Sequence, residues 1–556
     1  MGKNYFLLLV FVFFSCVGLQ AQRNKKKTPE PKPIEAEQVP KLVVGIIVEQ
    51  MRYDYLTRFW NHYSEGGFKR LIKEGFNCKN HHINHAPTST APSLASIYTG
   101  ATPSIHGIIG NTWYDKTQDM EVYGVEDKEY SSVGTFSNAG KMSPHRMLST
   151  TITDQLRLHT QKQGKVIAVA LKDVAAVLSG GHMTNAAYWF DGGEVGKWIT
   201  SSYYMSQLPQ WVSDFNSSDA IKKYKKEWNT LKDIGSYVES GPDNNVYETP
   251  FENEASPIFP HNTPSLLSKE KDFDVLKYTP YGNNITTDFA LEVLEKESLG
   301  VDSTTDFLAI SFSSTDYVGQ KFGLNSKEIQ DTYLRLDLDL ERMLKALDEK
   351  VGVGQYTLFL TSDYGGVREP AYLRDQKVPA GYIDLGEMRG KFNEFLRYKY
   401  GTTDVVQNIS NFQVFLNHRV IENLDIDLGD AQEEIALELL GYDKVNQVYT
   451  AFQMWQNEYT SGIPYLLQKG YHQKRSGDIF LVPKPGFAQY GRTDFTKDAA
   501  MIYDTHMPLL FFGNGIKQGA TTNRTEVVDI APTISTLLGI AFPNGTTGNP
   551  IGEVLK

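Results

Sequence analysis

Cysteine is nearly absent from this chain of 556 residues, which contains only Cys16 and Cys78. Cys16 lies in an apolar N-terminal stretch that we interpret below as a cleaved signal, so the mature chain keeps Cys78 alone. A single thiol excludes an internal disulfide, and the fold must therefore depend on its hydrophobic core. The length and a hydrophobic content of 40% are sufficient for a large core.

Positive charge is also scarce. The formal net charge is -11, with 55 Lys and Arg against 66 Asp and Glu. Proteins that bind nucleic acids neutralise phosphates with clustered Lys and Arg, so nucleic acid is not an expected partner. The charged fraction of 22% is ordinary for a folded soluble protein and excludes a disordered or fibrous chain.

No apolar run in the sequence is long enough to cross a bilayer, so no transmembrane segment is expected. At the N-terminus, Lys3 precedes an apolar stretch from Tyr5 to Val17, and the small residue Ala21 follows shortly after. This pattern is typical of a secretory signal, which we predict at residues 1–21 with cleavage after Ala21. The alternative is a lipid anchor at Cys16, because the residues before it weakly resemble a lipobox.

From Lys41 onward, β-rich apolar runs alternate with helical patterns, which predicts an α/β fold with a mostly parallel central sheet flanked by helices. The predicted strands are Lys41–Val48, Val166–Leu171, Phe307–Phe312, Tyr356–Leu360 and Pro508–Phe512, and the clearest predicted helix is Ser326–Glu349. Residues 22–40, basic and rich in proline, are predicted to be a flexible linker. No repeat or second linker divides residues 41–556, so we predict one domain, with about 183–274 as a cap-like insertion.

Polar residues follow four of the predicted strands. Glu49 follows the first, Lys172 the second, residues 313–316 the third and residues 361–363 the fourth. A single polar residue at such a place is more often a turn former or helix cap. Because ligands of open α/β sheets bind at the carboxyl ends of the strands, four such segments favour one shared crevice.

A series of short motifs runs in order along the chain from about Lys41. They are Val48–Leu56, Thr88–Pro92, Ser96–Gly100, Pro103–Gly107, Leu171–Asp173, Ser314–Gly319, Thr361–Asp363, Tyr503–His506, Asp529–Ile534 and Gly548–Ile551. Together they resemble the alkaline phosphatase superfamily, and most closely its PafA-type members, which are related to type I phosphodiesterases and nucleotide pyrophosphatases. The resemblance implies an alkaline phosphatase-like fold and hydrolysis of phosphate esters with two zinc ions. It also implies export to the periplasm or cell envelope of a Gram-negative bacterium.

The resemblance assigns three residues to the reaction itself. Thr90 stands at the position of the nucleophile, and Asn111 and Lys172 stand where the family contacts phosphoryl oxygens. Two neighbouring positions differ from the family. Ser93 replaces the glycine that usually follows Pro92, and Val174 replaces an arginine that clamps phosphate, which removes a bidentate contact.

The zinc ligands implied by the resemblance are largely replaced. The implied sets read Glu49, Thr90, Asp363 and Tyr364 for one zinc, and Asp316, Gln320 and Lys497 for the other. Gln320, Tyr364 and Lys497 stand where the family has zinc-binding histidines, so only the carboxylates remain. A neutral amide is a weak ligand and a protonated lysine has no lone pair. We therefore expect Lys497 to supply positive charge beside Asp316 where the metal lay.

On this basis we interpret the chain as an exported pseudoenzyme with no cofactor, which acts as a binding or scaffold component with protein partners in the envelope. The alternative is an atypical metal-dependent phosphomonoesterase or phosphodiesterase that uses Thr90. One weakly held divalent ion at Glu49, Asp316 and Asp363 would then suffice, because magnesium accepts carboxylates. A further metal site at His81, His82 and His85 is a weaker alternative, since clustered histidines are usually structural or solvated.

Overall fold

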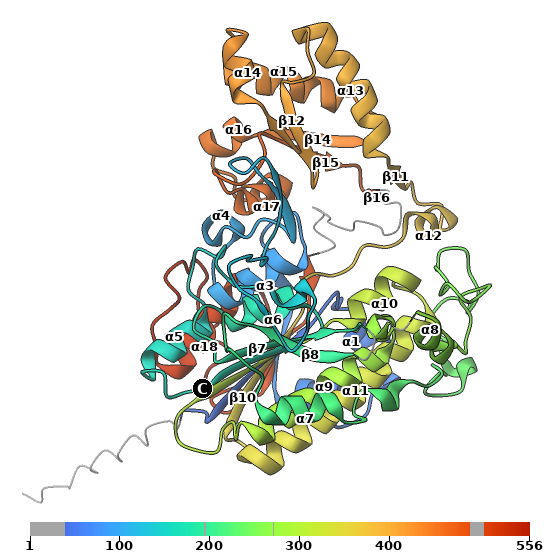
Figure 1. Cartoon of the computed structure of the whole chain (residues 1–556), viewed down its shortest axis with the longest axis vertical. Coiled ribbons are helices and arrows are strands. Elements are labelled where there is room, and N and C mark those ends of the chain that lie inside the picture. The colour runs from blue at the N-terminus through green and yellow to red at the C-terminus, as the bar shows by residue number, and fades with distance from the viewer. Residues whose placement is uncertain (1–38, 194–195, 271, 490–504) are drawn as a thin grey trace, which may run out of the picture. The chain divides into compact units, whose positions relative to one another are not determined.

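The computed structural model describes residues 39–193, 196–270, 272–489 and 505–556 (Figure 1). The predicted signal at residues 1–21, the lipid anchor at Cys16 and most of the linker at 22–40 lie outside the described residues, as does Lys497. Those expectations stay predictions.

Eleven strands of the described residues form one mixed sheet. In sheet order they are β17 (His506–Met507), β2 (Phe76–His82), β18 (Leu509–Gly513), β10 (Tyr356–Thr361), β1 (Leu42–Val48), β9 (Asp306–Phe312), β6 (Val166–Ala170), β7 (Ala186–Asp191), β8 (Lys197–Ser201) and β5 (Ser132–Val133), with β19 (Gly519–Glu526) also paired to β2. The five central strands from β10 to β7 are parallel. The α/β class is thus confirmed, and the antiparallel pairs lie toward the edges.

The central strands contribute side chains to two hydrophobic cores, because successive side chains of a strand point to opposite faces. In β1 every residue is buried. Leu42 and Val44 pack into one core, together with α9 (Pro280–Lys296) and α11 (Lys327–Leu347). Val43 packs into the other, together with α3 (Thr90–Thr99) and α6 (Asp173–Gly180). A continuously apolar strand is therefore what a sheet covered on both faces requires.

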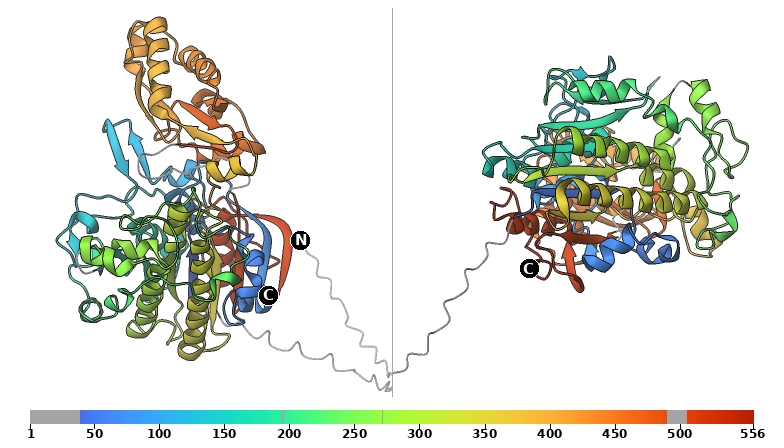
Figure 2. Two further views of the ribbon diagram at one scale, coloured as in Figure 1. Left: turned by 90° about the vertical axis from the view of Figure 1, so that its right-hand side faces the viewer. Right: turned by 90° about the horizontal axis from the view of Figure 1, so that it is seen from below.

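Helices cover both faces of this sheet, and α9 and α11 lie side by side on one of them (Figure 2). The helix α11 matches the predicted helix Ser326–Glu349 and begins where the Ser326 hydroxyl accepts a hydrogen bond from the Ile329 N–H. The remaining helices of this part are α1 (Tyr55–Arg58), α2 (Phe68–Glu74), α4 (Pro103–His106), α5 (Ile152–His159), α7 (Gln210–Ser217), α8 (Thr263–Glu270), α10 (Ser314–Phe322), α12 (Pro370–Asp375) and α18 (Ile530–Leu538).

All five predicted strands are present as β1, β6, β9, β10 and β18, with ends that differ by one residue or so. One of them has the opposite direction, because β18 pairs antiparallel with β10. The strands β7 and β8 lie within the range 183–274 and extend the main sheet. The cap-like role of the rest of that range stays a prediction.

A second sheet lies between residues 406 and 483 and was not predicted from the sequence. Its strands are β12 (Val406–Ser410), β13 (Gln413–Leu416), β15 (Ile479–Pro483) and β14 (Val445–Thr450), and its helices are α13 (Leu385–Tyr400), α14 (His418–Asn423), α15 (Leu428–Leu440), α16 (Ala451–Gln456) and α17 (Gly462–Gly470). It has its own hydrophobic cluster, which includes Phe392, Val414 and Ile435. Two small pairs complete the described strands: β3 (Thr112–Asp115) with β4 (Met120–Tyr123), and β11 (Gly381–Ile383) with β16 (Phe487–Gln489). No helix among the described residues is both long and apolar enough to cross a membrane.

The core packing predicts a large cost for truncating Phe289 on α9. Its fully buried ring stacks on Trp198, with 4.3 Å between the ring centroids. Phe289→Ala should lower the free energy of unfolding by about 3–5 kcal/mol, because it removes apolar contacts and leaves a cavity. Denaturant-induced unfolding measures this change. The matched control is Phe136→Ala, at a fully exposed phenylalanine, and an equal loss in both variants would contradict the core assignment.

Candidate active site

Four polar segments meet at one edge of the main sheet. The strands β10, β1, β9 and β6 are parallel neighbours, so their carboxyl ends lie at the same edge. Asp363, Glu49, Ser313 and Lys172 follow these ends, and the contacts described below join them. The convergence expected from the sequence is therefore observed, and it follows from strand direction and strand order alone.

The ammonium of Lys172 lies between two buried carboxylates. Its Nζ is 2.6 Å from Glu49 Oε2 and 2.5 Å from Asp316 Oδ2. The ring of Tyr317 lies below it, with its centroid 4.9 Å from Nζ. Burial alone would lower the pKa of Lys172, but Asp316 and Glu49 raise that pKa well above its ordinary value. Lys172 is therefore a fixed positive charge in the site.

Glu49 is fully buried and its other oxygen is also engaged. Glu49 Oε1 accepts hydrogen bonds from the hydroxyls of Ser311 and Ser313, at 2.9 and 2.6 Å. The hydroxyl of Thr315 donates to the Glu49 carbonyl at 2.6 Å. These donors fix the carboxylate in one orientation, with Oε2 toward Lys172.

Asp316 is the most heavily bonded carboxylate of the site. The Tyr364 hydroxyl donates to its Oδ1 at 2.5 Å, and Gln320 Nε2 donates to both oxygens at 2.9 and 3.0 Å. Burial and the neighbouring carboxylates raise the pKa of Tyr364 well above its ordinary value, so the phenol keeps the proton that it donates. The cation expected beside Asp316 was Lys497, which lies outside the described residues, and the ammonium in contact with it is that of Lys172.

Asp363 differs from Glu49 and Asp316 because one of its oxygens has neither a hydrogen-bond donor nor an ion-pair partner among the described residues. Its Oδ1 accepts from the backbone N–H groups of Gln50 and Tyr364, both at 2.9 Å. Its Oδ2 is buried and has no hydrogen-bond partner among the described residues. Burial, with the charges of Glu49 and Asp316, raises the pKa of Asp363 well above its ordinary value. An orphaned buried oxygen of this kind is where a proton or a cation is expected.

Thr90 is the first residue of α3 and is buried. The preceding residue, Ser89, has an extended backbone, so the chain turns into the helix at Thr90 with the first helical N–H groups unpaired within the helix. The side-chain oxygen of Asn111 accepts from the Ala91 N–H at 2.8 Å. The positive end of the helix dipole therefore lies at the expected nucleophile, a suitable place for phosphoryl oxygens.

Thr90, Asn111 and Lys172 line one cavity of about 340 Å³. Other residues that line it are Tyr123, Leu171, Asp173, Val174, Trp189, Asp191, Asp274, Lys277 and Tyr317. Lys277 was missed from the sequence, because nothing near it marks a strand end or a motif. Tyr317 had a signal, since it lies within the motif Ser314–Gly319.

The three histidines that precede the nucleophile, His81, His82 and His85, do not form one metal-binding cluster. His81 and His82 are neighbours in β2 and pair separately, His81 with the Thr525 hydroxyl and His82 with Asn80. Burial lowers the pKa of His85 to about 4, so its ring is neutral. Among the described residues, no group of three or more His, Cys, Asp or Glu is arranged to hold a metal ion.

The described donors do not fit a pair of zinc ions. Zinc sites are built from nitrogen or sulfur lone pairs with carboxylates, typically three protein ligands for each catalytic ion. Here Gln320 and Tyr364 turn an N–H and an O–H toward Asp316, so neither offers a lone pair in that direction. The oxygens of Glu49 and Asp316 that face each other are bound to Lys172.

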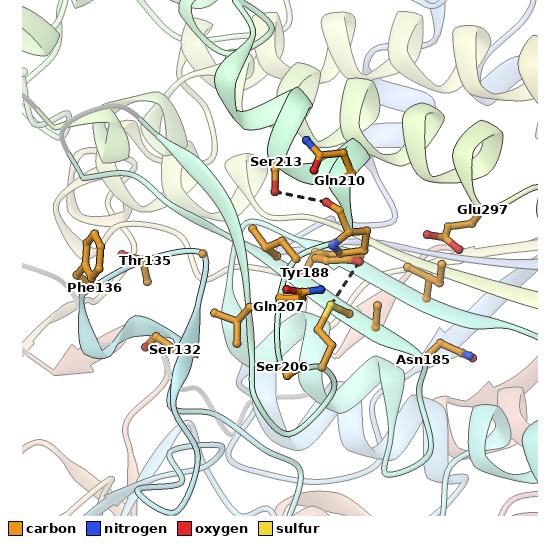
Figure 3. A pocket seen from close by; sticks show the side chains of 17 residues that line it. Ser132, Thr135, Phe136, Asn185, Tyr188, Ser206, Gln207, Gln210, Ser213 and Glu297 are labelled. Atoms are coloured by element: carbon orange, nitrogen blue, oxygen red, sulfur yellow. Dashed lines mark hydrogen bonds between the residues drawn. The ribbon is translucent and has the colours of Figure 1, made fainter.

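A second cavity, of about 1040 Å³, lies away from these groups (Figure 3). Ile167, Asn185 and Ala186 line it and stand at the amino ends of β6 and β7, the edge opposite the site. The Tyr188 hydroxyl points to the Met205 sulfur at 3.9 Å in this cavity. It has no grouping of nucleophile and charge like that around Thr90, so the smaller cavity is the candidate active site.

Comparisons with known proteins show which family the chain resembles. The model of the family described as type I phosphodiesterase / nucleotide pyrophosphatase matches residues 43–504. A relative from Myroides odoratus named calcium-transporting ATPase is 44% identical over 100% of this chain and 99% of its own. Alkaline phosphatase PafA from Elizabethkingia meningoseptica is 41% identical over 93% of this chain and 94% of its own. The crystal structure of wild-type PafA superposes with a TM-score of 0.89 at 41% identity, covering 93% of this chain and 99% of that one.

This chain belongs to the alkaline phosphatase superfamily, as a PafA-type member. Membership corrects the interpretation of the chain as an inactive scaffold, because a protein 41% identical over 93% of it is named an alkaline phosphatase. That interpretation took the loss of imidazoles as loss of the reaction, whereas Thr90, Asn111 and Lys172 still line one cavity. The hydrolase alternative fits better. The expectation of no cofactor also conflicts with membership, since the motifs imply a metal-dependent family.

The hydrogen bonds of Asp316 predict that Tyr364→Phe destabilises the protein. The change removes one donor and leaves a buried charged oxygen with fewer partners, at a cost of about 1–3 kcal/mol. A fall in melting temperature in thermal unfolding measures it. Tyr398→Phe, at a tyrosine that is 90% exposed, is the matched control and should leave the melting temperature unchanged. Equal melting temperatures for Tyr364→Phe and the unsubstituted protein would contradict the described network.

Proposed function

We propose that the protein is a phosphate-ester hydrolase in which the Thr90 hydroxyl is the nucleophile, with phosphomonoesters or phosphodiesters as substrates. The observation that carries this proposal is the placement of Thr90, Asn111 and Lys172 around one cavity at the N-terminus of α3. The alkaline phosphatase name of the relative PafA supports the same reaction. Helix N-termini attract phosphoryl groups through the helix dipole and free N–H groups. At α3 the Ala91 N–H is bound to Asn111 and Pro92 has no N–H, so the dipole carries more of this attraction.

The proposed reaction has two displacements at phosphorus. Thr90 Oγ1 forms a bond to phosphorus while the bond from phosphorus to the ester oxygen breaks, and the alcohol leaves with a proton. Water then attacks the phosphothreonine, which releases the phosphate product and restores the hydroxyl. Asn111 lines the cavity and directs its oxygen to the Ala91 N–H, so its amide N–H₂ end is the part that can donate to a phosphoryl oxygen.

One divalent ion fits the chemistry of this site better than two zinc ions. Asp363 Oδ2 is a buried carboxylate oxygen without a protein donor. Carboxylate oxygens suit magnesium or manganese, which do not need imidazole ligands. We propose Asp363 as the residue that holds such an ion. A bound divalent ion would lower the pKa of a nearby hydroxyl and offset charge on the phosphoryl oxygens.

We further propose that the protein is exported to the periplasm or cell envelope. The pattern of residues 1–21, with a basic start and a short apolar core, supports a secretory signal. Edman sequencing of the mature protein after expression with its own N-terminus checks this, and a mature chain that still begins at Met1 would contradict export through a cleaved signal.

The nucleophile proposal predicts that Thr90→Ala lowers the turnover of a chromogenic phosphomonoester or phosphodiester by about a thousandfold or more. Thr90→Ser should retain turnover, because it keeps a hydroxyl at the same position. Steady-state rates in the presence of magnesium, manganese or zinc measure both effects. Thr522→Ala, at an exposed threonine, is the matched control with an unchanged rate. Equal turnover by Thr90→Ala and the unsubstituted protein, or no turnover with any of these ions, would sink the proposal.

A further inference from the structure

The position of Lys172 carries an inference about the metal content of the site. Two acidic side chains from different segments, Glu49 and Asp316, point one oxygen each at the same lysine nitrogen. We infer that the Lys172 ammonium is the built-in cation that joins Glu49 and Asp316, so that this half of the site takes no divalent metal ion while Lys172 is present. In the alkaline phosphatase-like scaffold, a side chain then takes the place of one metal.

The Lys172 ammonium occupies the space between the two carboxylates. Glu49 Oε2 and Asp316 Oδ2 lie 2.6 and 2.5 Å from Nζ, which are close ion-pair contacts, shorter than the roughly 2.7–2.9 Å usual between an ammonium and a carboxylate. A metal ion that bound the same two oxygens would have to approach each to about 2.0–2.2 Å, in the space that the ammonium fills. The lysine and a metal ion therefore exclude one another at this point.

The other oxygens of the two carboxylates already accept hydrogen bonds. Glu49 Oε1 is used by the hydroxyls of Ser311 and Ser313. Asp316 Oδ1 is used by Tyr364 and Gln320. A carboxylate oxygen has about two acceptor positions, so these four donors leave no lone pair of Oε1 or Oδ1 for a metal. An ion that binds these two carboxylates must therefore use Glu49 Oε2 and Asp316 Oδ2, the two oxygens that Lys172 contacts.

The Lys172 ammonium also offsets the negative charges of Glu49 and Asp316. Glu49 and Asp316 are both buried, and two buried carboxylates without a cation between them would repel each other. The side chain of Lys172 is 15% exposed, so water screens this interaction little. Tyr317 adds the face of its ring to the same ammonium. The pair of acids therefore has a permanent counter-ion supplied by the chain itself.

This inference goes beyond the proposed function and does not rest on turnover. It concerns Glu49, Asp316 and Lys172, whereas the ion proposed for the reaction belongs to Asp363. The inference is measured by metal stoichiometry and thermal stability. A protein that has the expected metal content but no activity would contradict the proposed function without contradicting the inference.

The test is Lys172→Met, which removes the ammonium and keeps an unbranched apolar chain. The matched control is Lys277→Met, at a lysine that lines the same cavity but pairs with the half-exposed Asp274. Bound manganese and zinc per chain are measured by elemental analysis after equilibrium dialysis. We expect Lys172→Met to bind about one ion more per chain than the unsubstituted protein and Lys277→Met, and to gain thermal stability when manganese is added. Adding Gln320→His and Tyr364→His to Lys172→Met should tighten zinc binding further, since both supply imidazole.

Two outcomes would overturn the inference. One is an unsubstituted protein that already binds two ions per chain. The other is a folded Lys172→Met that binds no more metal than Lys277→Met and melts at the same temperature with and without manganese. If Lys172→Met does not fold, Lys172→Met with Asp316→Asn decides the question, because removal of one acid together with the cation should restore folding. A double variant that also fails to fold would count against the charge pairing.

Discussion

A lysine ammonium held between two buried carboxylates is the interaction on which the rest of this site depends. Charged groups are rarely buried unless each is paired and hydrogen-bonded. Lys172 pairs with Glu49 and Asp316, and the oxygens that it does not contact are supplied with donors by Ser311, Ser313, Tyr364 and Gln320. These donors meet that need. Removal of any one would leave a buried carboxylate oxygen with one donor fewer.

The fold of this protein is that of its family, whereas the contacts within the site depend on its own residues. The parallel strands bring the same four segments together as the family motifs imply, and α3 directs its N-terminus to the same cavity. Within that frame, Gln320 and Tyr364 have become donors to Asp316, and Asp363 keeps a free oxygen. The protein therefore keeps the scaffold of a phosphate-ester hydrolase, and part of the positive charge in its site comes from the Lys172 side chain.

Much of the fold was predictable because the responsible signals are local. β1 is continuously apolar and β9 largely so, as strands covered on both faces must be, and Ser326 marks the start of α11. The direction of β18 was not predictable, since an apolar strand reads alike in a parallel or an antiparallel pair. The sheet of residues 406–483 was also missed, because β12 is only half-buried and gives a weak pattern.

The sequence predicted which residues converge at the candidate site, but not which of their side chains contact one another. The order of strands places Glu49, Lys172, Asp316 and Asp363 together, and the motifs single out Thr90. The sequence does not state which cation meets Asp316, because that depends on the reach of side chains from neighbouring strands. We expected Lys497 there, and that expectation stays a prediction because Lys497 lies outside the described residues, among which the ammonium in contact with Asp316 is that of Lys172. Similarly, the loss of imidazoles was visible in the sequence, but the conclusion drawn from it about activity was wrong.

The central claim is that the Thr90 hydroxyl is the nucleophile that accepts the phosphoryl group, and detection of a covalent intermediate tests it most directly. Protein mixed with a phosphomonoester and quenched in acid within one turnover can be digested and mapped by mass spectrometry. The account predicts one phosphoryl group on the peptide that contains Thr90, located on that side chain. Hydrolysis without any phosphoryl group at Thr90, or with the group on another residue, would contradict it.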